Sequence, residues 1–423
     1  MTRSLISLVF FLSVHALFAN GPEAWEDARY RPFRHAKEDY QARVANDPFN
    51  AIRPRLVSGQ AALDRSSEKA FVTSLLKALD IPVSSQMLVY STTSLQLSRI
   101  SPRNPRALYF NEDIYLGWVP GGQIEVLSID PEWGAMPYMF NIPRGNNSPL
   151  NIERTRNTCM RCHASNDIGA VPGLLMASVM PGPGGGSLDE FKGGEVGHQI
   201  PLEKRFGGWH VTGGDNLPKH KGNMTGRFEK GEILTFANPH GQQFPVERYP
   251  IPTSDVLPQL LHEHQAGFVN RFLAATYRTR AMLAGELPHV AEGQETAYLD
   301  WEAGKLVRYL LFADEAPLPK GGLSGDPRFQ ADFLAKAKKA KDGSSLRDFD
   351  LKGKIFKYRC SYMLHSAVFR GMPGELKSAV AKKLRHALGD TAGDGEFAYL
   401  PKAERVSIRR ILRETIPSLP PDW

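Results

Sequence analysis

The chain has 423 residues but only three cysteines, at positions 159, 162 and 360. Three cysteines cannot form the disulfide framework of a small secreted domain. After the N-terminus no segment reaches 18 apolar residues, so the sequence predicts no membrane span in the body of the protein. The chain has no fixed-period repeats either, and its composition is that of an ordinary globular protein.

Several catalytic motifs are also absent. The glycine-rich stretch from Gly182 to Gly194 contains neither the phosphate-binding G-x-x-x-x-G-K-[ST] pattern nor the dinucleotide-binding G-x-G-x-x-G pattern. The serine-hydrolase G-x-S-x-G and metalloprotease H-E-x-x-H patterns do not occur either. We therefore interpret this stretch as a flexible loop, not as a nucleotide site.

The charge balance argues against a nucleic-acid partner. Lys and Arg number 52 and Asp and Glu 45, which gives a net charge of +7 spread along the chain. The one dense basic run is Lys336, Lys338, Lys339 and Lys341, and no known nucleic-acid motif accompanies it. We interpret the run as the solvated face of a helix.

Residues 1–19 are typical of a secretory signal peptide. Arg3 supplies the positive charge, an apolar run extends from Ser4 to Phe18, and cleavage could follow Ala19 or Ala16. An uncleaved N-terminal anchor is the alternative. The sequence thus predicts export to the periplasm, with no stable membrane insertion after the signal is removed.

The motif that points to chemistry is Cys159-Met160-Arg161-Cys162-His163. C-x-x-C-H is the attachment pattern of c-type haem. Two thiols at this spacing can form thioethers with the two vinyl groups of one haem, and the adjacent histidine is then held under the iron. The sequence therefore predicts one covalent haem c on Cys159 and Cys162, with His163 as the axial ligand of the iron.

The motif has three interpretations other than haem attachment. A thioredoxin-like redox pair would open a helix after a strand, whereas a polar loop, residues 144–157, precedes this one. A zinc site would need a second ligand pair, and Cys360 and His365 lie about 200 residues away. A chance occurrence is the third. Cys360 itself is expected to be buried and inert.

Hydrophobic patterning predicts an α+β fold with a β-rich N-terminal half, a haem-binding segment in the middle and a mainly helical C-terminal half. Residues 20–150 are expected to hold an extended arm (20–55), a short helix (66–79) and an antiparallel meander (87–142). Residues 151–250 are expected to form the haem-binding segment with glycine- and histidine-rich loops. Residues 251–423 are expected to be helical, with helices at 254–284, 296–312, 374–388 and 402–416.

Several stretches resemble an uncharacterised bacterial family of exported proteins with a monohaem cytochrome c domain. They are residues 81–119, 159–175, 198–223, 260–280 and 349–366, within a region that covers most of the chain from about 50 to 415. The chain differs from the family pattern at His210, where members often carry another aromatic residue, and at Met180. The resemblance implies haem binding and export, and no particular substrate.

The sixth ligand of the iron decides between functions, since two strong protein ligands suit electron transfer and an open position suits binding of small molecules. The candidates are His198, His210, His220, His264, Met176 and Met180. We favour His198 as the distal nitrogen, because the glycine-rich loop could carry it to the opposite haem face. Gly197 and Pro201 would also hold its backbone. His220 is the second choice.

From these features we expect a periplasmic electron-transfer cytochrome that exchanges electrons with a redox partner protein. The alternative is a haem enzyme or sensor with an open distal site, peroxidase-like or binding a small molecule. A third possibility is an interaction protein in which the haem is structural. A minimal single-haem carrier needs about 100 residues, so the remainder of the chain must dock a partner or enclose a substrate.

Overall fold

The computed structural model describes residue 25 and residues 31–145, 148–155, 158–189, 196–214, 216–389 and 395–417. The signal peptide expected at residues 1–19 lies outside this part of the chain. Within it, no helix combines the length and the apolar composition that crossing a bilayer requires.

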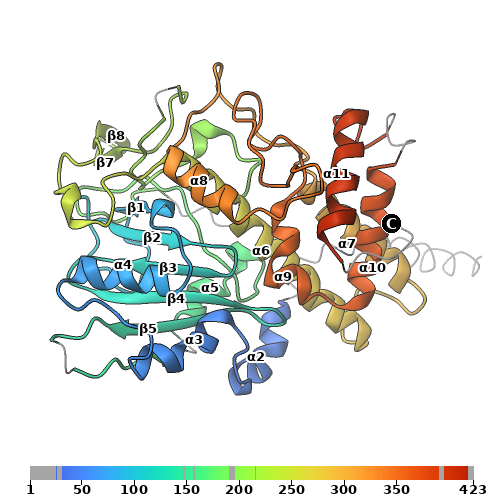
Figure 1. Cartoon of the computed structure of the whole chain (residues 1–423), viewed down its shortest axis with the longest axis horizontal. Coiled ribbons are helices and arrows are strands. Elements are labelled where there is room, and N and C mark those ends of the chain that lie inside the picture. The colour runs from blue at the N-terminus through green and yellow to red at the C-terminus, as the bar shows by residue number, and fades with distance from the viewer. Residues whose placement is uncertain are drawn as a thin grey trace, which may run out of the picture.

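The N-terminal half contains a six-stranded sheet whose strands follow one another in chain order, all antiparallel (Figure 1). The strands are β1 (Met87–Val89), β2 (Arg106–Phe110), β3 (Ile114–Trp118), β4 (Gln123–Asp130), β5 (Gly134–Asn141) and β6 (Glu153–Arg154). The predicted meander is therefore confirmed. A separate hairpin of β7 (Met224–Glu229) and β8 (Glu232–Ala237) follows later in the chain.

The two faces of this sheet differ. One face carries Tyr109, Leu116, Val126 and Tyr138 in one cross-strand row, all buried. Helix α3 (Pro48–Val57) packs on that face through Phe49, whose ring centroid lies 4.8 Å from that of Tyr138. On the opposite face Phe110 and Tyr115 are buried against His262 of α6, whereas Leu108, Leu127 and Met139 stay partly exposed.

The extended arm predicted for residues 20–55 is wrong over its described part. The chain there forms α2 (Pro32–Ala42) and α3. Pro32 and Pro48 occupy the first turns of the two helices, where a missing N–H is not needed, and Pro54 lies inside α3. Asp47 caps α3 by accepting a hydrogen bond from the backbone N–H of Asn50.

The C-terminal half is helical, as predicted. Its helices are α6 (Val256–Leu283), α7 (Glu295–Leu310), α8 (Pro327–Ala335), α9 (Ala367–Arg370), α10 (Gly374–Ala387) and α11 (Lys402–Thr415). Asp255 caps α6 through the N–H of Leu257. Helix α6 runs from beside the sheet toward the end of the molecule that holds α7, α10 and α11 (Figure 1).

Short elements complete the fold. They are α4 (Glu68–Ala78), α5 (Met160–His163) and the 3₁₀ turns Val83–Ser85, Asn166–Ile168, Leu202–Lys204, Val246–Arg248 and Tyr362–His365. The basic run at 336–341 follows the C-terminus of α8, so its prediction as a helix face is wrong. One hydrophobic cluster contains residues of all three expected regions, among them Leu75, Phe206 and Leu260.

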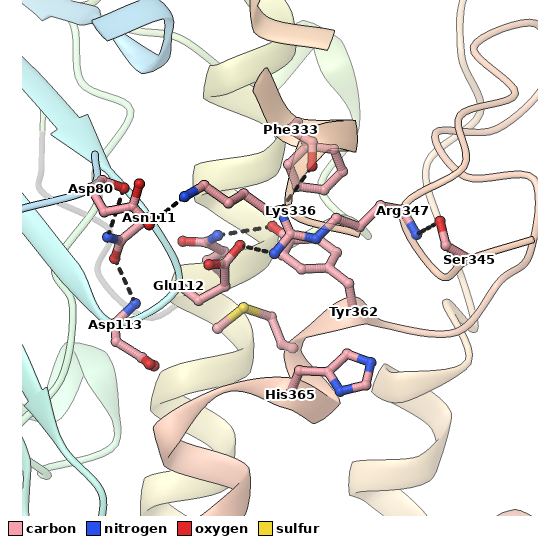
Figure 2. Close-up of polar contacts among 12 residues, drawn as sticks. Asp80, Asn111, Glu112, Asp113, Phe333, Lys336, Ser345, Arg347, Tyr362 and His365 are labelled. Carbon is pink, nitrogen blue, oxygen red and sulfur yellow. Dashed lines mark hydrogen bonds and ion pairs between the residues drawn. The ribbon is translucent and has the colours of Figure 1, made fainter. Parts of the chain in front are cut away.

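Arg347 ties the C-terminal segment to the sheet (Figure 2). Its guanidinium donates to Glu112 in the β2–β3 turn at 2.5 Å and to the carbonyl of Phe333 at 3.0 Å. It also lies 4.6 Å above the Phe333 ring and 5.2 Å above the Tyr362 ring. Only 11% of the Arg347 side chain is exposed, so a broken pair would leave Glu112 poorly compensated.

We expect Arg347→Met to lower the free energy of unfolding by about 2–3 kcal/mol, near the lower end for buried ion pairs because Glu112 keeps some solvent contact. The control is Arg328→Met, whose ion pair with Asp326 leaves the Arg328 side chain 59% exposed. That change should cost less than about 1 kcal/mol. Urea denaturation of the purified variants measures both, and equal losses would contradict this role of Arg347.

Candidate functional site

The C-x-x-C-H motif forms one short helical turn. The N–H groups of Cys162 and His163 both donate to the carbonyl of Cys159, at 3.2 and 3.0 Å. Positions three and four apart in a helix share one face, so the two thiols and the imidazole project to the same side. All three cysteines of the chain are free thiols, and Cys162 is exposed.

The His163 ring is oriented by a backbone carbonyl. Its Nδ1 lies 3.1 Å from the carbonyl oxygen of Gly173. Because a carbonyl oxygen can only accept, Nδ1 carries the proton and Nε2 keeps a free lone pair. A histidine with this tautomer presents Nε2 to a metal, with the carbonyl as the outer partner that fixes the ring.

The Gly173 carbonyl is itself held in place by α6. Asn270 of α6 accepts from the N–H of Leu174 and donates to its carbonyl, both at 2.8 Å. A Cβ on Gly173 would lie 2.3 Å from Asn270 Oδ1, so the close approach requires glycine. Pro172 also accepts from the N–H of Ala135 at the start of β5. The segment is thus fastened to both the helix and the sheet.

Two charges of the sheet act on the motif. Arg106 of β2 forms an ion pair with Glu125 of β4 at 2.9 Å and crosses β3 at Gly117. A Cβ at Gly117 would lie 2.6 Å from Arg106 Nη2. The charges of both residues influence Cys159 and His163, so the motif lies near this pair, on the partly exposed face of the sheet.

Apolar side chains on the same face remain accessible. Leu108, Gly117, Glu125 and Met139 form one cross-strand row. Leu108 and Met139 are only half-buried, as is Leu127 two residues beyond Glu125. Partly exposed leucine and methionine side chains beside a buried core are typical of a surface that contacts another apolar group.

Burial shifts the titration of the motif residues. It raises the pKa of the Cys159 thiol, against a hydrogen bond between Thr155 Oγ1 and the Cys159 sulfur at 3.1 Å. It lowers the pKa of His163, and the Arg106 charge acts in the same direction. The imidazole is therefore neutral near pH 7, as a metal ligand must be.

The structure places His198 elsewhere. His198 is buried between the rings of Tyr309 and Phe312, each with its centroid at 4.4 Å, and its Nδ1 lies 2.9 Å from Nδ1 of His264. His264 Nε2 in turn pairs with Ser361 Oγ at 2.7 Å. These contacts of His198 are with α6, α7 and Phe312 just after α7, whereas His163 contacts Gly173.

The other predicted ligands are also engaged apart from the motif. His220 accepts from the N–H of Gly222 at 3.0 Å and contacts the edge of Phe206. His210 is buried against Tyr90 and Phe244. Met180 is buried and packs near Gly226 of the β7 strand.

Met176 is the one predicted candidate that the structure brings close to a histidine on the sheet side of α6. Its sulfur lies 3.2 Å from Nδ1 of His262. The His262 ring meets Phe110 and Tyr115 edge-on, at 5.2 and 5.6 Å between centroids. Desolvation lowers the pKa of His262 to about 4, with a further contribution from Arg106. Sequence reasoning missed His262, Asn270 and Arg106 as site residues, although all three lie in stretches that carry the family resemblance, because none belongs to a short catalytic or ligand motif.

Cys360 is fully buried, as expected, and burial raises its pKa. Within the described ranges, no group of three or more Cys, His, Asp and Glu side chains has the arrangement of a metal site. Two thiols, a histidine of defined tautomer and an apolar sheet face together fit a haem.

The three thiols should react in a fixed order in the folded, reduced protein without attached haem. We expect iodoacetamide at pH 8 to modify Cys162 first, because it is exposed. Cys159 should follow more slowly because its pKa is raised, and Cys360 should react only after denaturation. Mass spectrometry of timed samples measures the order. Early modification of Cys360 would contradict its burial.

Comparison of the chain with protein-family models, with curated proteins and with solved structures finds no significant match.

Proposed function

We propose that this protein is a c-type cytochrome that carries one covalent haem and transfers electrons. The observation that supports it best is the helical turn of α5, which presents Cys159, Cys162 and His163 on one side while the Gly173 carbonyl holds His163 Nδ1. A hydrogen-bonded axial histidine next to two free thiols is what covalent haem attachment requires.

Each residue has a defined part in this proposal. Cys159 and Cys162 would attach the group through thioethers, and His163 would hold its iron through Nε2. Leu108, Leu127 and Met139 offer an apolar surface that excludes water, and Asn270 holds the segment that orients His163. The haem, when bound, supplies a one-electron redox couple.

Location in the periplasm is part of the same proposal. The N-terminal 19 residues are typical of a signal peptide. Covalent haem attachment takes place outside the cytoplasm, so the motif and the signal support each other. A haem enzyme or sensor with an open distal side would use the same attachment, and binding of carbon monoxide by the reduced protein distinguishes it from an electron carrier.

The test of the proposal is covalent haem at one equivalent per chain. When the protein is exported together with a haem-attachment system, acid–acetone extraction should leave the colour on the polypeptide. Cys159→Ala with Cys162→Ala should lose the covalent colour, and His163→Ala should lose the native Soret band.

Cys360→Ala is the matched control, since it removes the third thiol of the chain without touching the motif. It should keep one covalent haem. A wild-type protein that is colourless, or whose haem is extracted by acid–acetone, would refute the proposal.

A basic cleft beside the motif supports docking of an acidic partner. It has a volume of about 790 Å³ and lies between α2 and α5. Its charged lining residues are Arg31, Arg34, Lys37 and Arg161, and no acidic side chain lines it. These four form no ion pair with any residue that the structure describes. Arg161 lies between the two thiols in sequence, so a partner seated here would approach the haem edge. We propose that the redox partner presents carboxylates to this cleft.

Charge reversal in the cleft should slow electron exchange with anions. We expect Arg34→Glu with Lys37→Glu to slow oxidation of the reduced protein by ferricyanide about 3–10-fold at low ionic strength. The effect should fade at high salt because the charges are then screened. Stopped-flow absorbance measures the rates.

The control pair, Lys338→Glu with Lys339→Glu, makes the same change in net charge after α8. It should alter the rate less than about twofold if the effect is local. Equal slowing by both pairs would show that only net charge matters, and would contradict docking at this cleft.

A further inference from the structure

His262 is a buried histidine on the side of α6 that faces the sheet, and the proposed function does not yet use it. Only 7% of the residue is exposed. Phe110 and Tyr115 hold the ring edge-on from the same sheet face that carries Arg106 and Glu125. A buried imidazole of this kind normally has partners for both nitrogens.

Only one nitrogen of His262 has such a partner. Its Nδ1 lies 3.2 Å from the sulfur of Met176. A thioether sulfur can only accept, so Nδ1 carries the proton and Nε2 keeps its lone pair. Nε2 forms no hydrogen bond with any residue in the described part of the chain.

His163 has the same arrangement. Its Nδ1 donates to the Gly173 carbonyl, and its Nε2 likewise has no hydrogen-bond partner among the residues described. The two imidazoles thus share a tautomer in which Nε2 is the available ligand. Contacts tie both to the same sheet: Thr155, which contacts the Cys159 sulfur at 3.1 Å, donates its N–H to the Pro137 carbonyl of β5, and the His262 ring packs against Phe110 and Tyr115 of β2 and β3.

The segment from Gly173 to Met176 connects the two histidines. Near its start it is clamped by Asn270, and at its end it meets His262. Eight residues separate His262 from Asn270 on α6, which corresponds to about 12 Å along the helix axis. The helix therefore sets the distance between His262 and Asn270, which holds the segment behind His163.

We propose that His262 is the second axial ligand of the haem, with Met176 as the positioning residue that fixes its tautomer. The inference rests on the proposed covalent haem. It replaces His198, whose Nδ1 contacts His264 and whose Nε2 is buried without a hydrogen-bond partner among the described residues. Residues 262 and 264 are two apart, about 200° around α6, so they face opposite sides of the helix.

Two histidine ligands have consequences for function. Both coordination positions are filled by protein, which favours electron transfer over binding of small molecules. Histidine in place of methionine lowers the reduction potential. The hydrogen bond from Nδ1 makes the imidazole a stronger donor, so loss of the sulfur should raise the potential.

The experiment compares the purified holoprotein with His262→Gly, Met176→Leu and His198→Ala by absorption spectroscopy and carbon monoxide binding. The wild type should be low-spin and should not bind carbon monoxide rapidly. His262→Gly should become high-spin and bind it, and added imidazole should restore the low-spin spectrum. Met176→Leu should stay low-spin with a raised potential, and His198→Ala should resemble the wild type.

Several results would overturn the assignment. They are a high-spin wild type, a spin change in Met176→Leu with none in His262→Gly, and a spin change in His198→Ala. If His262→Gly does not accumulate, His262→Met serves instead and should give a low-spin protein with a higher reduction potential. A high-spin His262→Met, or one with an unchanged reduction potential, would reject His262 as the second ligand. Absence of covalent haem in the wild type would instead refute the proposed function, so the two failures are distinguishable.

Discussion

The hydrogen bond between His163 Nδ1 and the Gly173 carbonyl is the contact on which the site depends. It orients the one imidazole of the motif and leaves Nε2 free. The carbonyl can serve because Asn270 clamps Leu174 and because glycine allows the chain to pass close to α6. A local motif is thereby attached to a helix about 100 residues away in sequence.

The sheet provides an apolar surface beside the motif, whereas helix α6 positions the segment that orients His163. The alternating side chains of the sheet separate a face on which α3 packs from a face where Leu108, Leu127 and Met139 remain half-buried. The ion pair of Arg106 and Glu125 crosses that second face at Gly117. Apolar contact and a nearby compensated charge pair can therefore coexist, which suits a large cofactor with both apolar and charged edges.

Much of the fold follows from local patterning. The strands from Met87 to Asn141 alternate with clear turn residues, and α6 has a capping aspartate and a long apolar face, so both were predictable. The arm was predicted wrongly because a proline at the first helical turn resembles a proline in an extended chain. The basic run after α8 failed for a related reason, since lysines favour helices and solvated turns alike.

The sequence by itself determined the meander and the helical half, and it contains the C-x-x-C-H motif and the signal-like N-terminus on which the proposed function rests, because each depends on residues close together in the chain. Only the tertiary structure decided which side chains meet the motif. From the sequence alone, His198 and His262 are equally plausible ligands. Their environments differ because His198 contacts His264, and residues 262 and 264 project from opposite sides of α6. Such a choice depends on how a helix packs against a sheet, and no local pattern encodes it.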